Sequence, residues 1–301
     1  LVGSEMCIRD SCYFMLSNED KIRSISIWNG NINIKPLEGG ITNLNYIVQD
    51  NEKKVVVRLG SDIPEHLVFR QNEISVSKAA FEIGTSPKLI HNEPGILVID
   101  FIESTTLDPQ GVRENLARII PVIKNIHKSI PMKLSGQPPL FWVFYVIKYY
   151  ANFLIKNESN HIPIINELLD KNEKLEMLSS PRDIVFGHND LLAANFLDDG
   201  SKIWVVDWEY GGFNDPLFDL GGLSSNNDFD TQLEEQLLEM YFEKKPSSDL
   251  FIKYNAMKTA SLLRETMWSM VSEITSKIDF NYGEYTSDNL TKFNNAFERL
   301  K

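Results

Sequence analysis

Hydrophobic and polar positions change their spacing about one third of the way along the chain. Before that point, short apolar runs bounded by turn residues predict strands at 32–37, 41–48, 54–59, 88–91 and 95–102. Residues 18–28 and 64–83 have helical spacing instead, and Gly84 is expected to end the second of these helices. Five strands with an inserted helix predict a small α+β lobe.

Longer helical patterns follow Glu103. They cover residues 109–129, 138–157, 162–178, 249–278 and 287–300. Pro131, Pro163 and Pro181 are expected to act as breaks at the first three of these helices. Short strands are expected in the stretch between the third and fourth helices. We place the boundary between the sheet-rich and helix-rich parts within residues 101–104, giving segments 15–102 and 103–301.

Residues 1–14 do not continue either pattern. They lack the cationic start and apolar core of a signal peptide, and we expect a leader that is non-native or disordered, with Met15 as the start. The two cysteines, Cys7 and Cys12, both lie in this segment, so no disulfide framework is expected and a cytoplasmic location fits. No apolar run reaches the roughly 20 residues that a membrane-spanning helix needs, so membrane insertion is not expected.

The composition and net charge restrict the kinds of molecule that this protein is expected to bind. The hydrophobic fraction of 43% and the charged fraction of 24% are ordinary for a globular protein. The formal net charge of −12 disfavours nucleic acid, whose phosphates attract basic surfaces. The same charge suits a small cationic molecule, although an acidic surface that only aids solubility would look the same.

Three groups that phosphoryl transfer requires occur in order within residues 186–221. Asp190 ends an HxD triplet, Asn195 follows five positions later, and Asp207 comes directly after the apolar run 203–206. In kinases a carboxylate of the first kind orients the attacking hydroxyl and can accept its proton. An amide and a second carboxylate hold Mg²⁺ on the nucleotide. His188 and Asp219 are expected to brace the loop rather than to react.

The stretch resembles the catalytic segment of the protein-kinase-like superfamily, in the form found in aminoglycoside phosphotransferases and choline/ethanolamine kinases. Residues 207–216, DWEYGGFNDP, are similar to the DWEY…NDP signature of bacterial choline kinases. Residues 268–271 resemble the WSxV segment of that family, residues 280–285 its FxYxxY segment, and residues 39–43 its GGxTN element. The chain is therefore identified as a member of the choline/ethanolamine kinase family. These elements run in matching order from about residue 35 to the C-terminal region.

This resemblance implies an α+β, protein-kinase-like fold with two lobes. Residues 15–102 would form the nucleotide-binding lobe, with its five-stranded sheet and one helix. Residues 103–301 would form the mainly helical catalytic and substrate-binding lobe. It also implies ATP and Mg²⁺ as cofactors.

Residues for the nucleotide follow from the same comparison. Gly39, Gly40, Thr42 and Asn43 match a loop that covers phosphates, where glycine lets backbone approach closely, although a GG between strands is also an ordinary turn. The hinge residues Phe101 and Ile102 would contact the adenine.

Arg58 occupies the strand position where most kinases have Lys and choline-kinase-like members have Arg. It is expected to act as a catalytic residue by contacting the phosphates, and to pair with Glu73 on the following helix. Glu65 and Glu82 are the competing partners.

The acceptor is expected to be held by aromatic rings. A quaternary ammonium has no N–H to donate, so proteins bind it with ring faces and nearby carboxylates. The residues expected to contact the substrate, besides Asp190, are Glu209, Tyr210, Trp268, Tyr282 and Tyr285. Trp268 and Phe280 could instead be core residues of the last helices.

At two places the sequence differs from the family pattern, so the identity of the acceptor alcohol stays undecided. Glu265 stands where many members have a second Trp, and residues 224–227 are polar where many choline kinases have a Glu and an aromatic residue. A more polar pocket would suit ethanolamine, another amino alcohol or thiamine.

The sequence favours an ATP- and Mg²⁺-dependent choline kinase that forms phosphocholine. The alternatives are an ethanolamine or thiamine kinase, an aminoglycoside-type phosphotransferase, and an inactive kinase-fold binding module. The last is disfavoured because all three catalytic groups are present. Expected partners are ATP and the cationic alcohol, and a homodimer is left open.

Overall fold

The computed structural model describes residues 17–37 and 43–300. Contacts divide the chain into two compact units: residues 1–61 with 88–101, here called the sheet unit, and residues 62–87 with 102–301, here called the helical unit. Segment 62–87 groups with the helical unit because its end is hydrogen-bonded there. Val205 N donates to Thr85 O at 2.8 Å, and Trp208 Nε1 donates to Ser86 Oγ at 3.1 Å. The contacts end the sheet unit at Phe101 and place residues 62–87 in the helical unit. The predicted lobes, 15–102 and 103–301, stay a prediction.

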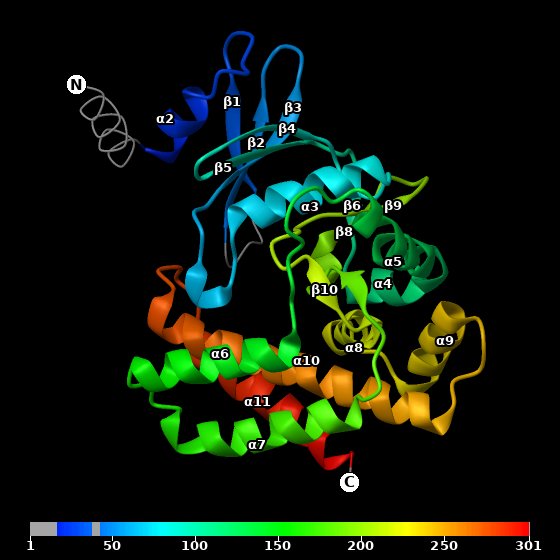
Figure 1. The fold of residues 1–301 in the computed structure, drawn as a ribbon. Coiled ribbons are helices and arrows are strands. Elements are labelled where there is room, and N and C mark those ends of the chain that lie inside the picture. Colours follow the sequence, from blue (N-terminus) through cyan, green and yellow to red (C-terminus); the bar gives the residue numbers. More distant parts are fainter. Residues whose placement is uncertain (1–16, 38–42, 301) are drawn as a thin grey trace. The chain divides into compact units, whose positions relative to one another are not determined.

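Five antiparallel strands form the sheet unit, in the order β1-β2-β3-β5-β4 (Figure 1). They are β1 (Asn33–Leu37), β2 (Leu44–Gln49), β3 (Lys54–Leu59), β4 (Leu89–Glu93) and β5 (Ile96–Asp100), and helix α2 (Asn18–Arg23) precedes them. The five predicted strands are all present, and the first helix is shorter than predicted.

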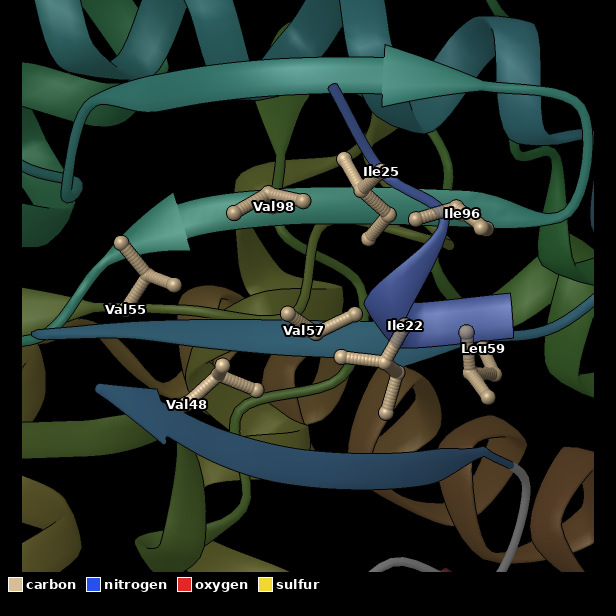
Figure 2. Close-up of a cluster of buried hydrophobic side chains, with 8 residues drawn as sticks. All are labelled: Ile22, Ile25, Val48, Val55, Val57, Leu59, Ile96 and Val98. Atoms are coloured by element: carbon tan, nitrogen blue, oxygen red, sulfur yellow. The ribbon is translucent and has the colours of Figure 1, made fainter. Parts of the chain in front are cut away.

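One face of this sheet carries the core of the unit. Alternation along β3 places Val55, Val57 and Leu59 on a single buried face. Figure 2 shows Ile22 and Ile25, from α2 and the turn after it, lying over this face beside side chains of β2 and β5. The pattern of apolar residues therefore sets both the strand face and the position of α2.

Helices make up most of the helical unit. They are η1 (Pro64–His66), α3 (Arg70–Glu82), α4 (Pro109–Glu114), α5 (Leu116–Ser129), η2 (Ile130–Met132), α6 (Val143–Lys156), α7 (Ile162–Leu178), η3 (Ala193–Asn195), α8 (Pro216–Asn226), α9 (Thr231–Phe242), α10 (Ser248–Thr275) and α11 (Tyr282–Glu298). Among the described residues, no helix is both long enough and apolar enough to cross a membrane.

Short strands surround the motif stretch. β6 (Thr105–Thr106), β8 (Phe196–Asp198) and β9 (Ile203–Val205) form one small antiparallel sheet, and β7 (Val185–Gly187) pairs with β10 (Gly212–Asn214). The HxD triplet follows β7, and Asp207 follows β9. These hairpin-like pairs hold the catalytic candidates at strand ends.

Three helix predictions were wrong in their extent or incomplete. The helix predicted at 64–83 is divided because Leu67 has a left-handed backbone (φ 59°), so η1 and α3 are separate. The helix predicted at 109–129 is interrupted at Asn115, and the one predicted at 138–157 begins only at Val143. Helices α8 and α9 were not predicted.

The long helix α10 is the centre of the helical unit. It contacts α6, α7, α8 and α11, and Figure 1 shows these helices grouped around it. Gly221 allows α8 to approach closely, because a Cβ at that position would lie 2.7 Å from the Cα of Lys258. This packing fixes the face of α10 that carries Arg264, Glu265 and Trp268.

Candidate active site

Asn189, the middle residue of the HxD triplet, ties the loop to strand β10. Its backbone is left-handed (φ 65°), a conformation that Asn tolerates better than most residues. Its Nδ2 donates to Tyr210 O at 2.9 Å and to Gly212 O at 3.0 Å, and its Oδ1 accepts from Asn214 Nδ2 at 3.1 Å. The sequence analysis gave Asn189 no role. Its side-chain amide can donate and accept hydrogen bonds at the same time, and this property could have indicated a bracing role.

Asp219 of α8 holds the same loop from the other side. Its carboxylate accepts from the backbone N–H groups of His188 (2.8 Å) and Asn189 (2.7 Å), and it contacts His127 Nε2 at 2.9 Å. Burial acts to raise the pKa of Asp219, but the hydrogen bond and charge of His127 outweigh it and the pKa is lowered. His188 Nε2 donates to Val206 O at 2.9 Å. The predicted bracing roles of His188 and Asp219 are confirmed.

Asp190 stands at the end of this braced loop with its side chain 17% exposed, so a substrate can reach it. The pKa of its carboxyl is raised to about 8, chiefly by burial. The guanidinium of Arg264, 3.7 Å from Oδ1, opposes that rise, whereas the negative charges of Glu265, Asp207 and Glu209 add to it. A carboxylate poised near neutrality is typical of a group that takes a proton during catalysis.

Asn195 and Asp207 offer oxygen donors beside this loop. Asn195 Nδ2 donates to Asp190 O at 2.8 Å, and Asn195 O accepts from Val206 N at 3.0 Å. The amide nitrogen is thereby used within the loop, which leaves the amide oxygen as the atom for the predicted metal contact. Asp207 has a left-handed backbone (φ 69°). One amide oxygen and one carboxylate suit Mg²⁺, which takes few protein ligands and keeps water and phosphate oxygens.

Among residues 17–37 and 43–300, no group of three or more His, Cys, Asp or Glu side chains could hold a metal ion. The Mg²⁺ assignment therefore depends on the Asn–Asp pair.

The aromatic residues predicted for the substrate form one continuous cluster. Trp268 Nε1 donates to Tyr210 Oη at 3.0 Å, and the Trp268 ring centroid lies 6.1 Å from that of Tyr282. Phe280 connects Tyr282 and Tyr285, with centroid distances of 4.9 and 5.6 Å. Trp268 is only 4% exposed, whereas Phe280, considered above as a core residue, is 39% exposed. The accessible part of the cluster is therefore the Phe280–Tyr285 end.

Two neighbours on α10 were missed as site residues. The Arg264 guanidinium lies 4.3 Å from the ring centroid of Tyr210, and its Nη1 lies 2.9 Å from Glu265 Oε2. Tyr285 Oη donates to Glu265 Oε1 at 2.8 Å. Sequence reasoning had treated Glu265 only as a departure from a second Trp. The structure connects it to the aromatic cluster and, through Arg264, to Asp190.

Glu209 is held by a cation that sequence reasoning also missed. Arg70 Nη1 lies 3.0 Å from Glu209 Oε2 and 2.7 Å from Glu73 Oε2. Both carboxylates are buried. Glu73 therefore shares Arg70 with Glu209. Its expected pairing with Arg58 stays a prediction, because Arg58 belongs to the sheet unit.

Of the residues predicted to bind the nucleotide, the structure describes only some. Gly39, Gly40 and Thr42 lie outside the described residues, and Asn43 is buried. Arg58 Nε donates to Asn45 Oδ1 at 3.3 Å, which fixes its direction on β3.

The hinge residues lie at the division between the units. Lys54 Nζ lies 3.7 Å from the Phe101 ring centroid, and Ile102 begins the second segment of the helical unit. A nucleotide-binding role for these residues stays a prediction.

Comparison with known proteins decides the family. A sequence model of the choline/ethanolamine kinase family matches residues 34–240. The chain belongs to the choline/ethanolamine kinase family. A probable ethanolamine kinase of Arabidopsis thaliana is 29% identical over 84% of this chain and 76% of its own length. Ethanolamine kinase 2 of Homo sapiens is 28% identical over 89% of this chain and 76% of its own length.

A solved structure agrees with this assignment. The choline kinase LicA of Streptococcus pneumoniae has 25% sequence identity and a TM-score of 0.77, covering 94% of this chain and 100% of LicA. The predicted kinase-like α+β fold and the predicted enzyme class are confirmed. This choline/ethanolamine kinase family member is thus a kinase, and choline and ethanolamine both appear in the names of its relatives.

Proposed function

We propose that this kinase transfers the γ-phosphoryl group of ATP to the hydroxyl of a small amino alcohol, with choline and ethanolamine as the candidate acceptors. The observation that carries the proposal is the position of Asp190. Its reachable carboxylate belongs to a charged group with Arg264 and Glu265, and Glu265 is hydrogen-bonded to the aromatic cluster through Tyr285. This arrangement supports an acceptor whose hydroxyl lies at Asp190 and whose cationic end lies near Glu265 and the aromatic cluster.

Charge in this group supports a cationic acceptor. Two carboxylates, Asp190 and Glu265, face one guanidinium, that of Arg264. Their charges leave an excess of one negative charge when both carboxylates are ionised. A singly charged ammonium would neutralise this excess and would also lower the pKa of Asp190 from its raised value, because an opposite charge favours the ionised form.

The chemistry of the step follows from these residues. Asp190 accepts a hydrogen bond from the acceptor hydroxyl and takes its proton as that oxygen bonds to phosphorus and the bond to ADP breaks. Asn195 and Asp207 would hold Mg²⁺, which when bound neutralises charge on the phosphates. Arg58 would add a further positive charge against the phosphates. Asn189 and Asp219 keep the loop in place, so Asp190 is already oriented when the acceptor binds.

A panel of acceptors tests the proposal. The purified protein is incubated with MgATP and, separately, choline, ethanolamine, thiamine and the aminoglycoside kanamycin, and both ADP release and the phosphorylated product are measured. Phosphorylation of choline or ethanolamine is the expected result. Turnover of kanamycin or thiamine alone would overturn the amino-alcohol assignment, and turnover of none of the four would overturn the proposed function.

A further inference from the structure

Glu265 is a partly exposed carboxylate that contacts both Arg264 and the aromatic cluster. It lies on α10 one turn before Trp268, and its side chain is 20% exposed. One carboxylate oxygen accepts from Tyr285 Oη at 2.8 Å, and the other lies 2.9 Å from Arg264 Nη1. A carboxylate offers about four lone-pair sites, so further donors can still bind it.

Glu265 contacts Arg264 and Tyr285. Besides burial, which has the larger effect, its negative charge raises the pKa values of Asp190, Tyr150 and Tyr285. Burial raises the pKa of the Tyr285 hydroxyl, and the Glu265 charge raises it further. Tyr285 therefore stays protonated and donates to Glu265. This contact turns one carboxylate oxygen toward the aromatic cluster.

We propose that Glu265 accepts hydrogen bonds from the ammonium of the acceptor and selects a primary ammonium, as in ethanolamine, over a quaternary one. The inference rests on the proposed function and names the substrate class within it. A primary ammonium donates short, charge-assisted hydrogen bonds to a carboxylate. The methyl groups of a quaternary ammonium prevent such bonds and hold the carboxylate at a distance.

The aromatic cluster supports the same preference for a primary ammonium. Quaternary ammonium groups gain most from several ring faces. One ring, that of Tyr210, already faces the Arg264 guanidinium at 4.3 Å, and Trp268 is almost completely buried. Fewer ring faces remain for a trimethylated cation, whereas the hydrogen-bonding carboxylate remains available.

Kinetics of two Glu265 variants test the inference. Glu265→Gln keeps the size and one acceptor oxygen but removes the charge, and Glu265→Trp replaces the carboxylate with a ring. Glu167→Gln is the matched control, because Glu167 is exposed on α7, is paired with Lys171 and lies outside the site. For each protein, kcat/KM is measured for ethanolamine and for choline with saturating MgATP, together with the melting temperature.

We expect the wild-type protein to prefer ethanolamine. Glu265→Gln should lower kcat/KM for ethanolamine roughly 10- to 100-fold, as loss of a hydrogen bond to a charged group does, and should change that for choline far less. Glu265→Trp should shift the ratio toward choline, and Glu167→Gln should leave it unchanged. An equal loss for both acceptors in Glu265→Gln would reduce Glu265 to a brace for Arg264 and overturn the inference. A wild-type preference for choline would also overturn the inference. If neither ethanolamine nor choline is turned over, the proposed function itself is contradicted.

Discussion

Two residues of the site have backbone conformations that most side chains avoid. Asn189 and Asp207 both lie in the left-handed region, with φ of 65° and 69°. Asn and Asp are the residues that tolerate this region best after Gly. Strained backbone of this kind persists where the surrounding structure fixes it, and it is concentrated at functional sites. The hydrogen bonds of Asn189 show how the HxD loop is fixed.

Asp207→Asn tests the predicted metal ligand while preserving this backbone. The variant keeps the shape and a residue type suited to positive φ, but it removes the negative charge. Loss of a residue that merely hydrogen-bonds a metal ligand lowers metal affinity roughly 10-fold or more. We therefore expect the nucleotide affinity measured with Mg²⁺ to fall at least roughly 10-fold when a ligand itself loses its charge. Nucleotide affinity without Mg²⁺ should stay unchanged, as measured by titration calorimetry with and without Mg²⁺. Asp249→Asn, at an exposed position, is the control, and equal Mg²⁺ dependence in both variants would contradict the assignment.

Trp268→Phe tests whether the buried end of the aromatic cluster supports the acceptor site. The change keeps an apolar ring but removes the N–H that binds Tyr210 and weakens attraction to cations. We expect KM for the amino alcohol to rise several-fold, corresponding to about 0.5–1 kcal/mol, while KM for ATP stays constant. Trp142→Phe is the control, because Trp142 also donates a hydrogen bond, to Glu176. A lower melting temperature with an unchanged acceptor KM would assign Trp268 to the core alone.

Residue spacing could predict Asp190, Asn195 and Asp207 because these groups occur close together in sequence. Arg70 and Arg264 could not be predicted in this way. They come from helices far from the motif, and only tertiary packing brings them to Glu209 and Asp190. A sequence pattern contains no information on which distant cation will neutralise a buried carboxylate.

At the scale of elements, η1 is fastened to α10 through one buried histidine. His66 Nε2 lies 3.1 Å from Ser272 Oγ, and its ring centroid lies 5.1 Å from that of Trp268. Burial and, to a smaller extent, the nearby Arg264 charge lower the pKa of His66 to about 3. The folded protein therefore keeps this imidazole neutral under conditions where an unfolded chain would protonate it.

His66 should make the folded state sensitive to mild acid. Because its folded pKa is lower than the ordinary 6.5, stability is fully present above pH 6.5 and is lost as the pH falls toward 3. At pH 5 the loss from this residue is about 2 kcal/mol. His66→Gln should remove this contribution to the pH dependence. The unfolding free energy of the variant should therefore change less between pH 7.5 and pH 5 than that of the wild type. His161→Gln, at a more exposed position, is the control, and equal pH dependence in wild type and His66→Gln would refute the account.

Strands of the sheet unit were predictable because their apolar runs are short and punctuated by turn residues. Helix limits were less predictable, since a left-handed residue such as Leu67 leaves no mark in the hydrophobic pattern. Helix α8 was missed because it is buried almost all round, so its sequence has no polar face to produce a helical period. Packing against α10, rather than amphipathicity, determines that helix.

At the scale of the whole molecule, the HxD loop, the predicted metal ligands and the acceptor-binding candidates belong to one compact unit. Asp190, Asn195, Asp207 and the aromatic cluster all lie in the helical unit, whereas Asn43, Arg58 and Phe101 lie in the sheet unit. The family match from residue 34 to 240 includes residues of both units. Chemistry at Asp190 and binding of the acceptor can therefore be tested with variants that leave the sheet unit unchanged.

Turnover by Asp190→Asn is the most direct test of the central claim, that this carboxylate acts on the acceptor hydroxyl. With MgATP and the preferred amino alcohol, we expect kcat to fall roughly 100-fold or more, because a positioned base contributes at least that factor. The nucleotide dissociation constant should stay within twofold of the wild-type value, and the melting temperature should not fall. Near-full turnover by a folded Asp190→Asn protein would contradict the account.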